Sequence, residues 1–345
     1  MHIIRKEIDD QFNALDKTVE YLSSQSKSIC DFFRDVNKVV IFGCGSSFSV
    51  AKSYEMFLCG MTGIPAFAVA AGDYIVNEND YKSIIKDSAI ITVSRSGSTS
   101  EIIRGAEIAK NYGAKKILSI CGAKEAEIAK LADLNIEMPW IYDHAICQTR
   151  TVNNLYAAGL MVAAIISGDT DTVEKLKSLS GYFDSFREKY LSVFEQIAKN
   201  SWNHGVVLAD SYMAGLAEEG ALAFKEICQL NSNHYHVLDV RHGPKVMINK
   251  ETIVISMISS GNRMLQQDLV TDIKKTGALN IVIDCAGKDP ILDADVRIEL
   301  PSINNDKVAA IFMLYCIQNI TYFKALQLNV NPDSPDGLDA WIKLA

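Results

Sequence analysis

The chain has 345 residues, of which 48% are hydrophobic and 22% are charged, and its formal net charge is −8. This composition is typical of a folded globular protein, and the length favours two domains. The negative charge and the lack of any lysine or arginine run argue against a nucleic-acid binder, so an anionic ligand would have to be held by local groups.

The first part of the chain alternates apolar strands with helices. After a leading helix we expect strands at 38–42, 64–69, 88–93, 116–121 and 134–138, with helices from Ser46 through Leu58 and over 100–112 and 124–131. Near-continuous apolar strands between helices predict a parallel sheet covered on both faces.

The second part repeats this plan. The apolar run 155–166 is too short to span a bilayer and predicts a buried helix. Strands are then expected at 205–209, 252–258 and 281–284, with helices over 211–230, 264–275 and 308–326. The first strands of the two parts, and likewise the third, are separated by about 165 residues, which indicates an internal duplication. We therefore expect an α/β fold of two tandem doubly wound parallel-sheet domains, 1–170 and 201–345, joined by a helical connector at 171–200.

The cysteines and the N-terminus indicate the compartment. No two of the eight cysteines form a C-x-x-C pair and most lie in apolar runs, so we expect reduced thiols. Charged residues at positions 5–7 stand where a signal peptide needs an apolar segment. A cytoplasmic protein without a membrane partner is the expectation.

Two turns carry the features of an anion site. Ser94-Arg95-Ser96-Gly97-Ser98-Thr99 joins a strand to a helix, so hydroxyls, backbone N–H groups and the helix N-terminus converge there. The alternative interpretation is an ordinary helix start, since Ser98 to Glu101 resembles a capping box. Gly43-Cys44-Gly45-Ser46-Ser47 is a weaker signal. It lacks the third glycine of a dinucleotide fingerprint and a following acidic residue, so NAD binding is not expected.

A carboxylate and an imidazole follow in the second part. Glu226 closes the segment that begins at Glu219-Gly220-Ala221-Leu222, and His242 lies on a loop before Gly243-Pro244. Such a pair suits proton transfer near neutral pH. From the residues alone, a solvated helix residue is the favoured interpretation of Glu226, and the alternative for His242 is a loop histidine bonded to the backbone. His234 and His236 alternate on an extended segment, but no third ligand is evident, so no metal is expected.

In their order and spacing these four motifs resemble tandem sugar isomerase (SIS) domains. The pattern resembles the isomerase half of glucosamine-6-phosphate synthase and, more closely, the fructosamine-6-phosphate deglycases, over nearly the whole chain. The resemblance implies that Ser47, Ser94, Ser96, Thr99 and the Arg95 backbone bind a sugar phosphate. It also implies that Glu226 moves a proton between C1 and C2 and that His242 opens the sugar ring from a neighbouring subunit, hence a homodimer with shared sites or a higher oligomer. Further substrate contacts are expected from Gly45, Ser46, Gln148, Thr149 and Glu219; the alternative for the adjoining Arg150 is a plain surface cation.

The departures from the synthases are informative. The printed sequence begins at the isomerase half. The synthases use a lysine in the C-terminal tail, where this chain has Ala340, and Lys343 is three residues away. A second synthase lysine is replaced by Ala223. The resemblance thus implies deglycation of a fructosamine 6-phosphate without metal or cofactor. An aldose–ketose isomerase, an aminosugar-phosphate deaminase and a non-catalytic sugar-phosphate sensor remain as alternatives.

Overall fold

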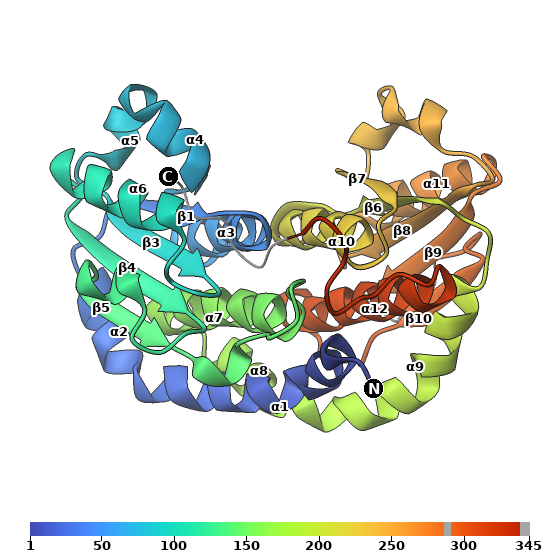
Figure 1. The fold of residues 1–345 in the computed structure, drawn as a ribbon, viewed down its shortest axis with the longest axis horizontal. Helices are drawn as coiled ribbons and strands as arrows, with labels where there is room; N and C mark the ends of the chain where they lie inside the picture. Colours follow the sequence, from blue (N-terminus) through green and yellow to red (C-terminus); the bar gives the residue numbers. More distant parts are fainter. Residues whose placement is uncertain (286–290, 339–345) are drawn as a thin grey trace. The chain divides into compact units, whose positions relative to one another are not determined.

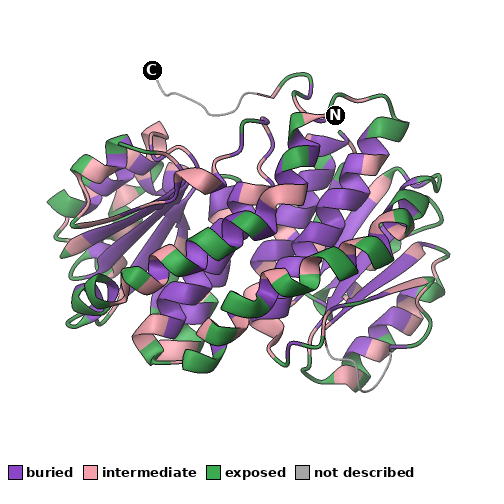
Figure 2. Ribbon diagram, turned by 90° about the horizontal axis from the view of Figure 1, so that it is seen from below, coloured by how far each residue is buried: buried purple, intermediate pink, exposed green. Residues whose placement is uncertain are grey.

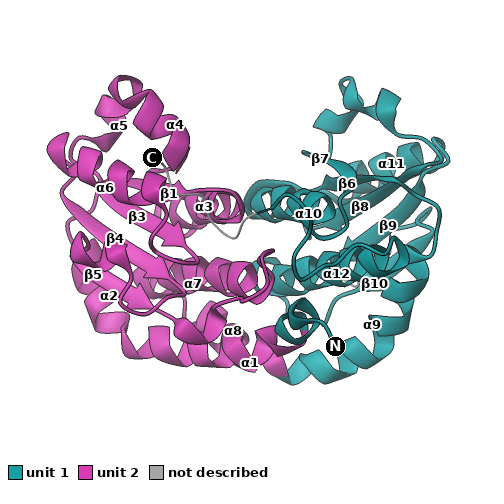
Figure 3. Ribbon diagram, in the orientation of Figure 1, with its two compact units in different colours: residues 1–8, 181–338 teal, residues 9–180, 339–345 magenta. Residues whose placement is uncertain are grey.

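The computed structural model describes residues 1–285 and 291–338, which form two compact units (Figure 3). Unit 1 contains residues 1–8 and 181–338, and unit 2 contains residues 9–180. Ala340 and Lys343 lie outside the described residues.

Unit 2 is built on a five-stranded parallel sheet in the order β2-β1-β3-β4-β5 (Figure 1). The strands are β1 (Val39–Gly43), β2 (Ala66–Ala70), β3 (Ala89–Ser94), β4 (Lys116–Cys121) and β5 (Leu134–Glu137). The helices are most of α1 (Ile3–Ser24), α2 (Ser26–Phe33), α3 (Ser46–Phe57), α4 (Ala71–Val76), α5 (Lys82–Ile85), α6 (Ser100–Asn111), α7 (Arg150–Ser167) and α8 (Thr170–Ser178).

Different helices cover the two faces of this sheet. Val40 and Phe42 of β1 share a buried cluster with Ile102 and Ala106 of α6. Helices α3 and α7 pack on the opposite face and against each other. Every residue of β1 and β3 is therefore buried, and Figure 2 shows the strands mainly in purple. This explains the continuous apolar strands in the sequence.

Unit 1 repeats the architecture with the order β10-β9-β8-β6-β7, again fully parallel. Its strands are β6 (His204–Leu208), β7 (Asn231–Tyr235), β8 (Thr252–Ile258), β9 (Leu279–Asp284) and β10 (Val296–Glu299), and its helices are α9 (Phe183–Ala198), α10 (Ala214–Ile227), α11 (Arg263–Lys274) and α12 (Asp306–Gln327). Matched in chain order, the two sheets have the same strand order. The expectation of two doubly wound parallel-sheet units is confirmed.

Several local predictions need correction. The helix expected over 124–131 is only a 3₁₀ turn, Glu127–Lys130. The sequence analysis missed β7 and β10, because edge strands this short and polar lack an apolar run. Within the described residues, α12 is long and apolar enough to cross a membrane, but 94% of its apolar window is buried, as in a core helix.

Candidate functional site

The sheet order of unit 2 fixes where a ligand can bind. The chain moves from β1 outward to β2 and then back across to β3, so the order reverses between β1 and β3 (Figure 1). Ligands of open α/β sheets bind beyond the carboxyl ends of strands at such a reversal. Both turns singled out in the sequence start there, one after β1 and one after β3.

The turn after β1 is shaped by two glycines. A Cβ on Gly43 would lie 2.4 Å from the carbonyl oxygen of Ser47, so only glycine lets the start of α3 approach the strand end this closely. Gly45 has φ +53° and precedes the first residue of α3. Ser46 and Ser47 follow it at the helix N-terminus and are buried. The turn thus places two hydroxyls at the positive end of a helix dipole.

The turn after β3 is organised by its own serines. The Ser94 hydroxyl accepts a hydrogen bond from Gly97 N (3.0 Å), and the Ser96 hydroxyl accepts one from Ser98 N (3.2 Å). Thr99, not Ser98, is the residue that precedes α6, and within the described residues its side chain makes no capping hydrogen bond. The capping-box interpretation is therefore wrong. Ser96 and Thr99 are half-buried at this helix N-terminus, where a phosphate would find hydroxyl and amide donors.

The Arg95 side chain has a different role from its backbone. Its Nη1 donates to the carbonyl oxygens of Ala145 (2.9 Å) and Ile146 (3.0 Å), and its guanidinium lies over the Tyr142 ring at 5.9 Å. Arg95 is 6% exposed. Its charge is thus directed into the protein, toward the loop that carries Gln148.

Gln148 and Thr149 lie on that loop, just before α7. Thr149 is fully buried, and its N–H donates to the Asp143 carboxylate at 2.7 Å. Gln148 is half-buried, and no partner among the described residues bonds its buried Oε1. Arg150 is not a plain surface cation, because it pairs with Asp10 (2.7 Å) and donates to the Tyr142 carbonyl (2.6 Å).

Asp143 is a residue that the sequence analysis did not select. Its carboxylate also accepts from Thr151 N at 2.8 Å, and the residue is 1% exposed. Burial raises the pKa of this carboxyl, although the two N–H donors and the charges of Arg150 and Arg95 oppose the rise. No local motif marks Asp143, because its partners are backbone amides six and eight residues ahead and arginines from two other elements.

Unit 1 contains Glu219 and Glu226, both on α10. Glu219 is 3% exposed and Glu226 is half-buried near the helix end, whereas the neighbouring Lys225 is exposed. A Cβ on Gly220 would lie 2.8 Å from Ile317 Cδ1, so this glycine allows α10 to pack closely on α12. Ala223 is 5% exposed and faces the interior of the fold.

His242 lies on the loop between β7 and β8 and is exposed. Val240 and Ile248 anchor this loop in a buried cluster, while Val246 is 84% exposed. His236 pairs with Asp210 at 3.1 Å. Across the described residues no group of three or more potential metal ligands occurs.

Unit 1 has a turn that corresponds to the turn after β3, but one of its amides is bonded to a carboxylate. After β8, Ser260 N donates to the Asp306 carboxylate (2.6 Å), Ser259 N donates to Gln266 Oε1 (3.0 Å) and Gly261 N donates to the Ser259 hydroxyl (3.2 Å). A carboxylate of the protein thus sits where an anion would bind. The turn in unit 2 is the better anion site.

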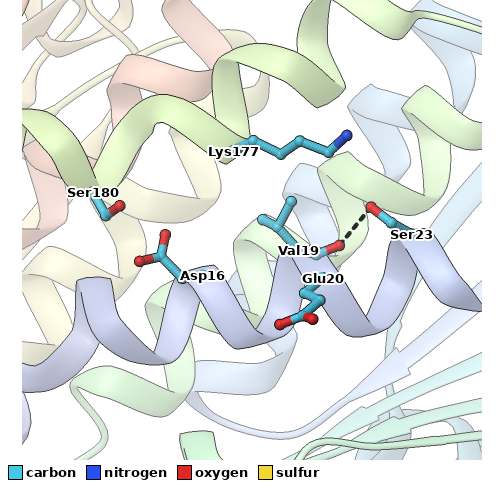
Figure 4. Close-up of a pocket in the computed structure, with 6 residues that line it drawn as sticks. All are labelled: Asp16, Val19, Glu20, Ser23, Lys177 and Ser180. Carbon is cyan, nitrogen blue, oxygen red and sulfur yellow. Dashed lines mark hydrogen bonds between the residues drawn. The ribbon is translucent and has the colours of Figure 1, made fainter.

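Unit 2 also has a separate pocket of about 370 Å³ between α1 and the end of α8 (Figure 4). Asp16 and Glu20 line it, and its cation, Lys177, pairs with Glu174 at 2.7 Å. This acidic lining does not suit a phosphate. The predicted site residues therefore fall into two groups. Unit 2 brings together both turns and the Gln148 loop, and unit 1 carries Glu219, Glu226 and His242.

Comparisons with known proteins show what the chain is similar to. A family model described as the SIS domain matches residues 32–167. The chain is 25% identical over 346 residues to glutamine–fructose-6-phosphate aminotransferase [isomerizing] of Sulfurisphaera tokodaii, covering 98% of this chain and 56% of that protein. The chain thus spans a little over half the length of the curated relatives it matches.

Solved structures share the fold over the whole chain. Tagatose-6-phosphate ketose/aldose isomerase from Escherichia coli superposes with a TM-score of 0.87 at 21% identity, covering 99% of this chain and 97% of the other. Glucosamine-6-phosphate deaminase from Thermotoga maritima gives a TM-score of 0.81 at 24% identity, covering 99% and 100%.

Proposed function

Because residues 32–167 match the SIS domain family model, we propose that this chain is a phosphosugar enzyme that deglycates fructosamine 6-phosphates. The observation that carries the proposal is the turn Ser94–Thr99, where hydroxyls and amides meet at a helix N-terminus at the reversal point of the sheet. This site suits the 6-phosphate of a sugar, and it needs no lysine.

The proposed reaction is a proton transfer along the sugar chain followed by hydrolysis. The substrate carries an amine nitrogen on C1 and a keto group on C2. Glu226 takes a proton from C1 as O2 gains one, which gives an enaminol. Return of a proton to C2 and loss of the N–H proton give an imine at C1. Water then hydrolyses the imine to an aldose 6-phosphate and a free amine, and each positioned proton transfer contributes roughly 10²–10⁴-fold.

Ala223 supports deglycation over glucosamine synthesis. By the resemblance, the synthases have a lysine here, whereas the Ala223 methyl group is 5% exposed on α10. An aldose–ketose isomerase or aminosugar-phosphate deaminase is the second candidate. The observation that favours it is the superposition with two proteins of those names over the whole chain.

The proposal includes a homodimer with shared sites in the cytoplasm. His242 would open the sugar ring of the neighbouring copy. Support comes from its place on an exposed loop whose Val246 and Met247 are 84% and 65% exposed, since apolar side chains this exposed suit a partner surface. The free state of all eight cysteines fits a reducing compartment.

The test is incubation of the purified protein with fructosamine 6-phosphates and 6-phosphorylated aminosugars, following free amine and glucose 6-phosphate. We expect the two products in equal amounts. Glu226→Gln should abolish turnover yet keep sugar-phosphate binding, because the amide has the same size but cannot accept the proton. Lys225→Gln, at the exposed neighbouring position, is the matched control. The second candidate would be established by aldose–ketose interconversion without amine release, or by release of ammonia and a ketose 6-phosphate from a 6-phosphorylated aminosugar. Binding without turnover would indicate a sensor.

A further inference from the structure

We propose that Arg95 is a positioning residue, whose side chain fixes the loop carrying Gln148 at a set distance from the phosphate turn. The inference rests on the proposed function, because it assumes that the turn after β3 holds the sugar phosphate. It goes further by assigning the Arg95 side chain a task separate from that of its backbone.

The first step is the fixed backbone of Arg95. Its carbonyl oxygen accepts a hydrogen bond from Gly122 N at 3.0 Å, just beyond β4. Ser94 on one side and Gly97 on the other are joined by the hydrogen bond inside the turn. A phosphate bound at this turn would therefore meet a backbone that is already held in place.

The second step is the direction of the side chain. One nitrogen, Nη1, donates to two successive carbonyl oxygens, those of Ala145 and Ile146, while the planar guanidinium lies over Tyr142. Lysine could not reproduce this arrangement, because its ammonium is a point charge without a planar face. The Arg95 side chain therefore joins the turn directly to the backbone two and three residues before Gln148.

The third step is the rigidity of the loop on its other side. The Asp143 carboxylate accepts from Thr149 N and Thr151 N, so it bonds the loop to the first turn of α7. Arg150 bonds the Tyr142 carbonyl and pairs with Asp10 of α1. Because hydrogen bonds hold both ends of the loop, the loop cannot move freely to adjust to a bound ligand. The distance from the phosphate to the Gln148 amide is then set by the protein, and the site would discriminate ligands by the position of their hydroxyls.

The experiment compares two ligands that test different parts of the site. Inorganic phosphate tests the turn alone, and fructose 6-phosphate tests the turn together with the loop. For Arg95→Met we expect phosphate affinity within about threefold of wild type, because the backbone donors stay. Fructose 6-phosphate should bind roughly tenfold more weakly, in line with the loss of one hydrogen bond to the sugar. Gln148→Ala should give the same loss, and the double variant no more than either single change, because the two residues act as one unit.

Arg95→Lys keeps the positive charge but loses the guanidinium geometry, so it separates the positioning of the loop from the effect of the charge. It also replaces Arg95→Met in the experiment if that variant fails to fold. We expect it to show the same selective loss for fructose 6-phosphate. Arg263→Met is the matched control, since Arg263 is a half-buried arginine beside the second turn, bonded to Ser259 O and Asp284. It should leave both affinities unchanged. Equal weakening of both ligands by Arg95→Met, full rescue by lysine, or additive losses in the double variant would overturn the inference. A wild-type protein that binds neither ligand would instead refute the phosphate site and the proposed function.

Discussion

Replacing Gly97 by alanine should reduce both the stability of unit 2 and the binding of phosphate at the proposed site. Gly97 has φ +59°, which costs an L-residue about 1–2 kcal/mol. The added Cβ would lie 2.5 Å from Ala126 Cβ and 3.2 Å from Ile128 Cγ2. The Ala126 methyl cannot rotate away, so the backbone must move, and such overpacking costs about 1–3 kcal/mol. We expect a total loss of about 2–5 kcal/mol.

Gly168→Ala measures the loss of stability that comes from the positive φ alone, without overpacking. Gly168 has φ +70° and no described atom within 4 Å of the Cβ position, so this variant should lose only about 1–2 kcal/mol. Urea unfolding of both variants measures the difference, and titration with fructose 6-phosphate measures binding. Gly97→Ala should also bind the sugar phosphate more than tenfold more weakly. The forced backbone shift would disturb the hydrogen bond that Gly97 N donates to the Ser94 hydroxyl inside the turn. Equal stability of the two variants together with wild-type binding by Gly97→Ala would refute this account of the turn.

Three further outcomes are expected. Thr99→Ala should weaken binding of 6-phosphorylated sugars roughly 10–100-fold without loss of folding, since it removes one hydrogen bond to a charged group. Equal affinity of the parent protein for phosphorylated and dephosphorylated sugars would contradict the phosphate site. Hybrid dimers of Glu226→Gln and His242→Ala subunits, formed by refolding a mixture, should regain up to half of the wild-type activity. Verified hybrids that are no more active than either parent would show that His242 serves its own chain. Burial and the charge of Glu101 raise the pKa of Cys44 from 9.0 to about 12. At pH 8 the thiolate fraction of Cys44 is then about a thousandfold lower than that of a thiol with a pKa of 9.0. Iodoacetamide should therefore modify the exposed Cys30 long before Cys44 in mass-spectrometric peptide mapping.

The sequence predicted the sheets better than the contacts that position the site. Strands such as β3 are apolar throughout because both faces are covered, and that pattern is readable from residue types alone. The role of Gly97 could also be anticipated, since a glycine between a strand and a helix favours a tight turn. The task of the Arg95 side chain could not, because its acceptors are carbonyl oxygens fifty residues away, and any residue type offers those. Asp143 was not predicted either, because the groups that donate to it, Thr149 N and Thr151 N, are also backbone groups that any residue type offers.

The duplicated second turn shows why residue type alone does not identify a site. Ser259-Ser260-Gly261 follows a buried strand and precedes a helix, much like the turn after β3. The two differ in what bonds their amides. In unit 1 the acceptor for Ser260 N is Asp306, forty-six residues further along the chain. A carboxylate in that place supplies the negative charge that a phosphate would otherwise bring, and it would repel one. In unit 2 the acceptors for two amides of the turn are hydroxyls of the turn itself, those of Ser94 and Ser96. One architecture thus gives two turns of different charge, because a carboxylate remote in sequence bonds the turn in unit 1, whereas hydroxyls of the turn itself accept from its amides in unit 2.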